Sequence, residues 1–222
     1  MSHEITRYDY ALVRDFTDQI TESIGIERLY TDSNLLYPDA LYNYSLSDYK
    51  VLIEFLQEEL QQRGTPKTIH FLFVSSLSHL QGLYANLNEN IYIVVNDKLD
   101  VRWQQFTIVK EICSAYVDHY QDEILKNTIY EDSDFLGSIE DAYKNIVAGT
   151  IQDGLKEGDL DSERFSVLLA TELMIPQTYR YLTNNYLTQV DDQELTLNEV
   201  AKSLVIPELI LKLYMSNYNF NN

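Results

Sequence analysis

Apolar residues recur every three to four positions in two stretches near the start of the chain, a spacing that predicts amphipathic helices. The first helix is expected over residues 7–24, with Gly25 ending it, and Ser45 is expected to cap the second. Between them, residues 26–44 mix Asp, Asn, Ser, Pro and Tyr without a period, which is typical of a loop. Residues 1–66 therefore form a predicted N-terminal helical region.

The pattern changes after residue 66, where β-branched and aromatic residues follow one another. Three such runs, 68–74, 82–87 and 91–95, predict short strands, and residues 88–90 between the last two are typical of a turn. Three short strands in succession predict a small antiparallel sheet of about three strands laid against helices.

From about Asp100 to its end the chain is expected to be helical. The spacing of apolar residues predicts helices over residues 101–123, 138–153, 161–174, 177–187, 196–204 and 207–217. The predicted fold class is α+β and mostly helical, with a core over residues 67–190 and a C-terminal helix pair over 191–222. The core and the pair could also belong to one domain with the N-terminal region.

The 222 residues carry a net charge of −19, from 35 acidic residues against 16 Lys and Arg. Because nucleic-acid affinity depends on basic residues that displace counterions from phosphates, direct nucleic-acid binding is disfavoured. A protein partner, and a basic one in particular, is the favoured electrostatic counterpart. The alternative is that the acidic surface serves solubility alone.

No run of about 18 apolar residues is present, so no membrane association is expected. The start of the chain lacks the basic and then apolar pattern of a secretory signal, which favours a cytoplasmic location. The single cysteine, Cys113, excludes an intramolecular disulfide and a CxxC pair. It falls on the apolar side of its helix, where a buried small hydrophobic residue is expected.

Candidate chemistry lies in the helix that contains Cys113. A zinc-peptidase helix carries His-Glu-x-x-His, in which two imidazoles one turn apart hold the metal and the Glu acts on its bound water. The corresponding frame here is Lys110-Glu111-Ile-Cys-Ser114. The Glu is present, whereas a lysine and a serine stand in place of the histidines.

Several segments in consistent order over residues 68–215 resemble the ImmA/IrrE family of zinc metallopeptidases. They are the strand that ends at Asn96, the basic Arg102, the pair Phe106-Thr107, the segment Glu172-Leu-Met-Ile-Pro176 and the closing helix pair Leu197–Leu213. The resemblance implies a zincin-like metallopeptidase scaffold with a C-terminal helix-turn-helix-like pair.

Carrying over the family's functional positions one at a time leaves no metal ligand. The first His falls on Lys110, the second on Ser114, and the third ligand, a Glu, on Phe165, while the general base falls on Glu111. Shifting the alignment by two residues brings Glu163 to the third position but loses the match to the Met-Pro anchor. A degenerate family member without bound zinc is therefore expected.

A metal site could also have been rebuilt on the same helix. Helical spacing places Lys110, Ser114 and Asp118 on one stripe, with Glu111 beside it and His119 adjacent. Glu111, Asp118 and His119 could together bind a metal weakly. The competing interpretation is a polar, solvated or partner-facing stripe in which Lys110 pairs with Asp118, Glu111 or Ser114.

Two functions follow from the resemblance. The first is a non-catalytic binding or regulatory protein, because active family members cleave helix-turn-helix repressors, often in mobile elements, and the retained scaffold could hold such a basic partner. Its predicted binding residues line the former active-site cleft: Lys110, Ser114, Asp118, His119 and Phe165. The alternative is a divergent metal-dependent endopeptidase with Glu111 as general base and a relocated zinc site. No cofactor is expected for the first function, and zinc for the second.

Overall fold

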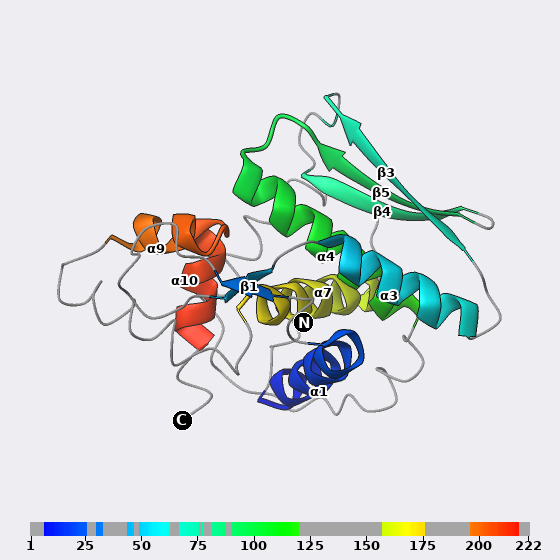
Figure 1. Cartoon of the computed structure of the whole chain (residues 1–222), viewed down its shortest axis with the longest axis horizontal. Helices are drawn as coiled ribbons and strands as arrows, with labels where there is room; N and C mark the ends of the chain where they lie inside the picture. The colour runs from blue at the N-terminus through cyan, green and yellow to red at the C-terminus, as the bar shows by residue number, and fades with distance from the viewer. Residues whose placement is uncertain are drawn as a thin grey trace.

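The computed structural model describes residues 7–25, 30–32, 44–46, 49–62, 67–75, 77, 81–87, 90–119, 157–175 and 196–217. Six helices and five strands fall in these residues (Figure 1). Their order is α1 (Arg7–Ile24), β1 (Tyr30–Asp32), β2 (Tyr44–Leu46), α3 (Tyr49–Gln62), β3 (Thr68–Val74), β4 (Gly82–Leu87), β5 (Asn90–Asn96), α4 (Val101–His119), α7 (Glu157–Met174), α9 (Leu197–Ser203) and α10 (Glu208–Asn217). The α+β class is confirmed.

Helix α1 has the bounds that its apolar spacing predicts. Gly25 ends it with φ +87°, a left-handed conformation that suits glycine, and its N–H donates to the carbonyl of Thr21 over 2.9 Å. The predicted helices 138–153 and 177–187, and the end of helix 101–123 beyond His119, lie outside the described residues. No helix in the described ranges is long and apolar enough to cross a bilayer.

The predicted cap at Ser45 is wrong. Ser45 lies in β2, where it pairs with Thr31 of β1 in a two-stranded antiparallel sheet, and α3 begins at Tyr49. The capping signal is local, whereas β2 pairs with β1, a strand inside the predicted loop 26–44 that no period had marked. The apolar stripe of α3 is nevertheless buried as expected, at Leu52, Leu56 and Leu60.

The three predicted strands form one sheet, but it is mixed and not antiparallel. Its order is β3-β5-β4, with β5 parallel to β3 and antiparallel to β4. Strands β4 and β5 form a hairpin, and β3 lies on the other side of β5. Central β5 alternates strictly, with Ile91, Ile93 and Val95 buried, because each face of a strand receives every second side chain.

Helix α4 lies between the sheet and α7. It contacts β4 and β5 on one side and α7 on the other, while α3 contacts both α4 and β3 (Figure 1). Every residue from Phe106 to Val117 except Lys110 is buried, because the helix is covered on both sides. Helix α1 packs on α7 and α3, so the candidate site on α4 lies in the middle of the molecule.

The C-terminal helices are confirmed within about one residue of their predicted bounds. Thr196 and Glu199 form a capping box at the start of α9, in which the side chain of each accepts from the backbone N–H of the other. Arg102 at the start of α4 donates to Asn198 over 3.1 Å, which ties the helix pair to the core. Between α9 and α10, Val205 has φ +54°, a left-handed conformation that is rare for a β-branched residue.

Candidate functional site

The carboxylate of Glu111 forms a buried ion pair with the neighbouring Lys110. Lys110 Nζ lies 2.9 Å from Glu111 Oε1, and the exposed fractions of the two side chains are 13% and 2%. Of the three partners that the sequence left open for Lys110, the structure selects Glu111. The attraction between the two opposite charges offsets part of the cost of removing them from water.

Strand β4 runs directly over this part of α4. A Cβ added at Gly82 would lie 2.4 Å from Thr107 Cγ2 and 2.6 Å from the carbonyl oxygen of Val94. It would also lie 3.5 Å from Glu111 Oε1, so the strand backbone passes next to the carboxylate. Glycine is required here because any side chain would overlap the helix or the neighbouring strand.

The remaining stripe residues have specific partners as well. Ser114 Oγ donates to the carbonyl of Lys110 over 3.1 Å, a bond within the helix. Asp118 is exposed and accepts a hydrogen bond of 2.9 Å from the phenol of Tyr84 on β4. Burial, and then the Asp118 charge and hydrogen bond, raise the pKa of Tyr84 above its ordinary value.

Phe165 lies among aromatic side chains of the core. It is buried and meets Phe16 of α1 edge to face, with ring centroids 5.9 Å apart. Phe16 in turn meets Tyr116 of α4 edge to face at 5.7 Å. The position that the resemblance predicts for a third metal ligand is therefore filled by a ring that packs between α1 and α7.

The described residues contain no group of three His, Cys, Asp or Glu side chains placed to hold a metal ion. Glu111, Asp118 and His119, the set proposed for a rebuilt site, accordingly do not converge. Glu111 is buried beside Lys110, Asp118 is exposed beside Tyr84, and His119 is half-buried at the last residue of α4.

Cys113 is buried as expected, and burial raises the pKa of its thiol, which removes nucleophilic character at neutral pH. It borders a small apolar recess of about 10 Å³ between α1, α3, α4 and α7. Ligand pockets measure several hundred cubic ångströms, so this recess is a packing defect and not a binding site.

Two contributors to the site were missed by the sequence analysis, Gly82 and Tyr84 of β4. Their chemistry has no motif, because they meet α4 only through the packing of the sheet on the helix. Glu172 of α7 was noted as part of a family segment, and the structure buries it.

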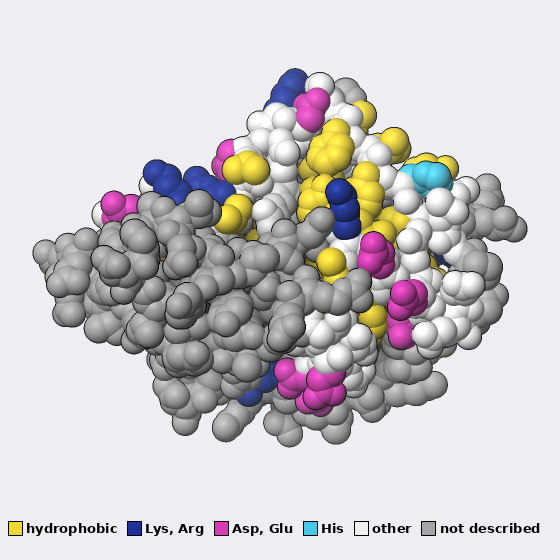
Figure 2. Space-filling model, in the orientation of Figure 1, with side chains coloured by type: hydrophobic (Ala, Val, Ile, Leu, Met, Phe, Trp, Pro, Cys, Tyr) yellow, Lys and Arg dark blue, Asp and Glu magenta, His cyan; other side chains and the backbone are white. Residues whose placement is uncertain are grey.

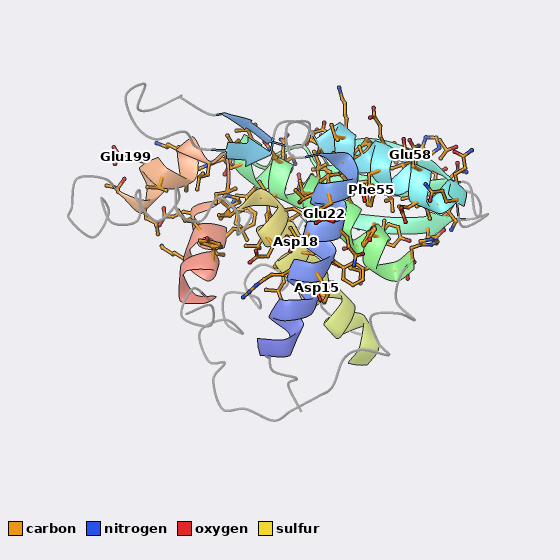
Figure 3. All side chains as sticks on the ribbon, turned by 60° about the horizontal axis from the view of Figure 1, so that its bottom comes forward. Asp15, Asp18, Glu22, Phe55, Glu58 and Glu199 are labelled. Carbon is orange, nitrogen blue, oxygen red and sulfur yellow. The ribbon has the colours of Figure 1, made fainter. Side chains whose placement is uncertain are left out.

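Exposed acidic side chains line the surface of α1. Asp15, Asp18 and Glu22 are spaced to lie along one side of that helix, and Glu58 is exposed on the neighbouring α3 (Figure 3). The negative charge expected from the composition is thus displayed on two adjacent helices.

No protein-family model matches this chain, and no curated protein matches it. The resemblance to the ImmA/IrrE family therefore stays a prediction from the motifs.

Proposed function

We propose that this chain is a non-catalytic, metallopeptidase-like binding protein whose partner is a basic protein such as a helix-turn-helix repressor. The state of Glu111 is the observation that carries this function. A general base must reach the metal-bound water and the substrate. Glu111 is 2% exposed, holds Lys110 at 2.9 Å and has the backbone of Gly82 beside it, which supports a structural role.

The order of elements supports a zincin-like scaffold. A hairpin of β4 and β5 leads into α4, the carboxylate of Glu111 lies against β4, and α7 packs on the other side of the helix. The motif order implies a strand, a turn, a second strand and then a long helix, and β4, β5 and α4 follow one another in that order. Lysine, serine and phenylalanine at the three ligand positions support loss of the metal, because an ammonium repels a cation and a phenyl ring has no donor atom.

The charge of the chain supports a basic partner. A net charge of −19, with acidic side chains exposed along α1, attracts cationic surfaces and raises their rate of association. Repressor DNA-binding domains carry such cationic surfaces because they contact phosphates.

The metal test uses the purified full chain. We expect plasma mass spectrometry to find far less than one zinc per chain after dialysis against zinc-containing buffer. A tightly held stoichiometric zinc would overturn the non-catalytic assignment.

Peptidase activity is tested on a purified helix-turn-helix repressor domain, followed by mass spectrometry. We expect no cleavage by the unaltered chain, by Glu111→Gln or by the control Glu58→Gln, which alters an exposed carboxylate on α3. Cleavage that disappears with a chelator and in Glu111→Gln, but persists in Glu58→Gln, would establish the divergent endopeptidase instead.

Binding is tested by fluorescence anisotropy with a helical peptide rich in Lys and Arg, and with a Glu-rich peptide of equal length as control. We expect the basic peptide alone to bind, and its affinity to fall as salt is added, because salt screens the attraction. If the basic peptide fails to bind at low salt, or binds equally at high salt, charge is not the basis of partner choice.

A further inference from the structure

Helices α1 and α3 meet along a line at which Phe55 lies. The two helices contact each other, and Phe16 of α1 and Phe55 of α3 both meet the ring of Tyr116, with ring centroids 5.7 and 6.0 Å from it. Ile20 of α1 borders the same small recess as Phe55. These shared contacts place Phe55 at the junction of α1 with α3.

The outer surface on both sides of this junction is acidic. Asp15, Asp18 and Glu22 are exposed on α1 and Glu58 is exposed on α3, while the half-buried Phe55 lies between Glu22 and Glu58 in the stick view (Figure 3). In the space-filling view, acidic side chains gather over these two helices, whereas hydrophobic ones gather over the sheet (Figure 2). We call the set Asp15, Asp18, Glu22, Phe55 and Glu58 the α1–α3 surface.

The charges of this surface are not compensated within the described part of the chain. No Lys or Arg falls among residues 15–27 or 51–62. The carboxylates of Asp15, Asp18, Glu22 and Glu58 form no hydrogen bond or ion pair in the described ranges. Their attraction for cations therefore remains available to a partner.

This arrangement of charges also opposes the stability of the helices that carry it. Asp15 and Asp18 are three residues apart and Asp18 and Glu22 four, so like charges face one another on successive turns. Glu22 lies in the last turn of α1, where the helix dipole favours a cation, and neither α1 nor α3 has a basic residue in its last turn. Sequence choices that act against local stability are expected at functional sites.

We propose that the α1–α3 surface is the docking site for a basic α-helix of the partner protein. Lys and Arg every three to four residues on one side of such a helix match the carboxylates of α1, which span about 10 Å at a rise of 1.5 Å per residue. A large apolar side chain of the same helix would cover the ring of Phe55.

Charge complementarity selects this occupant. A basic helix relieves the repulsion among the carboxylates, whereas an acidic helix, or a second copy of this chain with its net charge of −19, would add to it. The inference rests on the function proposed above, in which the partner is basic, and it identifies the surface that receives this partner.

The test measures fluorescence anisotropy at low salt, with the full chain and a labelled helical peptide that carries Lys and Arg at this spacing and one Leu between them. Asp18→Asn, Glu22→Gln and Glu58→Gln each remove one exposed carboxylate. We expect each to raise the dissociation constant roughly twofold to fivefold, and the triple variant to raise it roughly tenfold or more.

Glu199→Gln is the matched control. Glu199 is exposed on α9 and lies away from the α1–α3 surface in the stick view (Figure 3), and Gln can take its place in the capping box with Thr196. We expect this variant to leave the dissociation constant unchanged, although it alters the net charge as much as Glu22→Gln does.

The outcomes separate this inference from the proposed function. If Glu199→Gln weakens binding as much as Glu22→Gln, or the triple variant binds as tightly as the unaltered chain, the α1–α3 surface is not the docking site, while the choice of a basic partner stands. If the peptide fails to bind the unaltered chain, both are overturned. Circular dichroism verifies that each variant is folded.

The helical form of the partner is tested with a peptide of the same composition plus two central prolines, which break the helix. We expect it to bind more weakly, and equal affinity would overturn a helical partner. Hydrogen exchange on the unaltered chain locates the contact without any substitution. We expect the helical peptide to slow amide exchange in residues 15–24 and 51–58 and not in 197–203, and protection confined to other segments would overturn the site.

Discussion

The phenol of Tyr84 donates a 2.9 Å hydrogen bond to Asp118, and this contact joins the β4 edge of the sheet to the last turn of α4. Together with the close approach of Gly82 to Thr107, it holds β4 along the polar stripe of α4. The polar stripe of α4 thus serves to attach the sheet to the helix.

Removing the Tyr84 hydroxyl should destabilise the fold modestly. Tyr84→Phe keeps the ring but loses the bond to Asp118, so we expect the free energy of unfolding to fall by about 1 kcal/mol in urea denaturation. Tyr92→Phe, on the opposite face of the sheet, is the control for loss of a tyrosine hydroxyl. An equal loss of unfolding free energy in both variants would mean that the hydrogen bond to Asp118 adds no stability of its own.

The same bond predicts a pH dependence. The pKa of Tyr84 is raised in the folded state, so its contribution to stability is complete below the unfolded tyrosine pKa of about 10. It is lost as the pH rises toward the folded pKa. The stability difference between the unaltered chain and Tyr84→Phe should therefore shrink above about pH 10. A difference that grows with pH would contradict this direction.

A methyl group at residue 82 should be poorly tolerated. Gly82→Ala would bring a Cβ within 2.6 Å of the Val94 carbonyl oxygen, a backbone atom in a paired strand that moves little. We expect a loss of about 2–3 kcal/mol of unfolding free energy, typical of overpacking. Adding Thr107→Ser removes the other overlapping atom, Cγ2, and should restore part of the loss. If the changes in unfolding free energy of the two substitutions simply add in the double variant, residue 82 and Thr107 are not in close contact.

Removing one charge of the buried Lys110–Glu111 ion pair should destabilise the fold more than removing both charges. Lys110→Met leaves the Glu111 carboxylate buried without that ammonium, and we expect a loss of about 3 kcal/mol by chemical denaturation. Lys110→Met combined with Glu111→Gln removes both charges and should be less destabilised than Lys110→Met alone. If Lys110→Met is as stable as the unaltered chain, Lys110 does not stabilise the buried carboxylate of Glu111.

The turn between α9 and α10 is strained at Val205. Val205→Gly and Val205→Ala both remove the isopropyl group, but glycine adopts φ +54° readily and alanine does not. We expect the glycine variant to be more stable than the alanine variant by about 1 kcal/mol in thermal unfolding. The same pair of substitutions at Val200, inside α9, should show the reverse order, because glycine is the poorer helix former.

Local patterns sufficed for many of the elements. Helix α1, the three strands of the main sheet and the C-terminal pair follow from apolar spacing and stop signals, because each depends on neighbours a few residues apart. Local patterns failed at Ser45, where pairing with Thr31 overrides a capping signal. They also failed for strand direction, since three similar apolar runs do not reveal which one is central.

For the candidate site, the residue types alone specify which chemistry is present: a carboxylate at Glu111 and no imidazole at positions 110 and 114. The contacts that these groups make depend on the packing of the elements. Lys110 could have paired with three residues along the helix, and the cover of β4 and α7 leaves it beside Glu111. Tyr84 joins Asp118 from 34 residues away, a contact that depends on how the sheet packs and that no local period encodes.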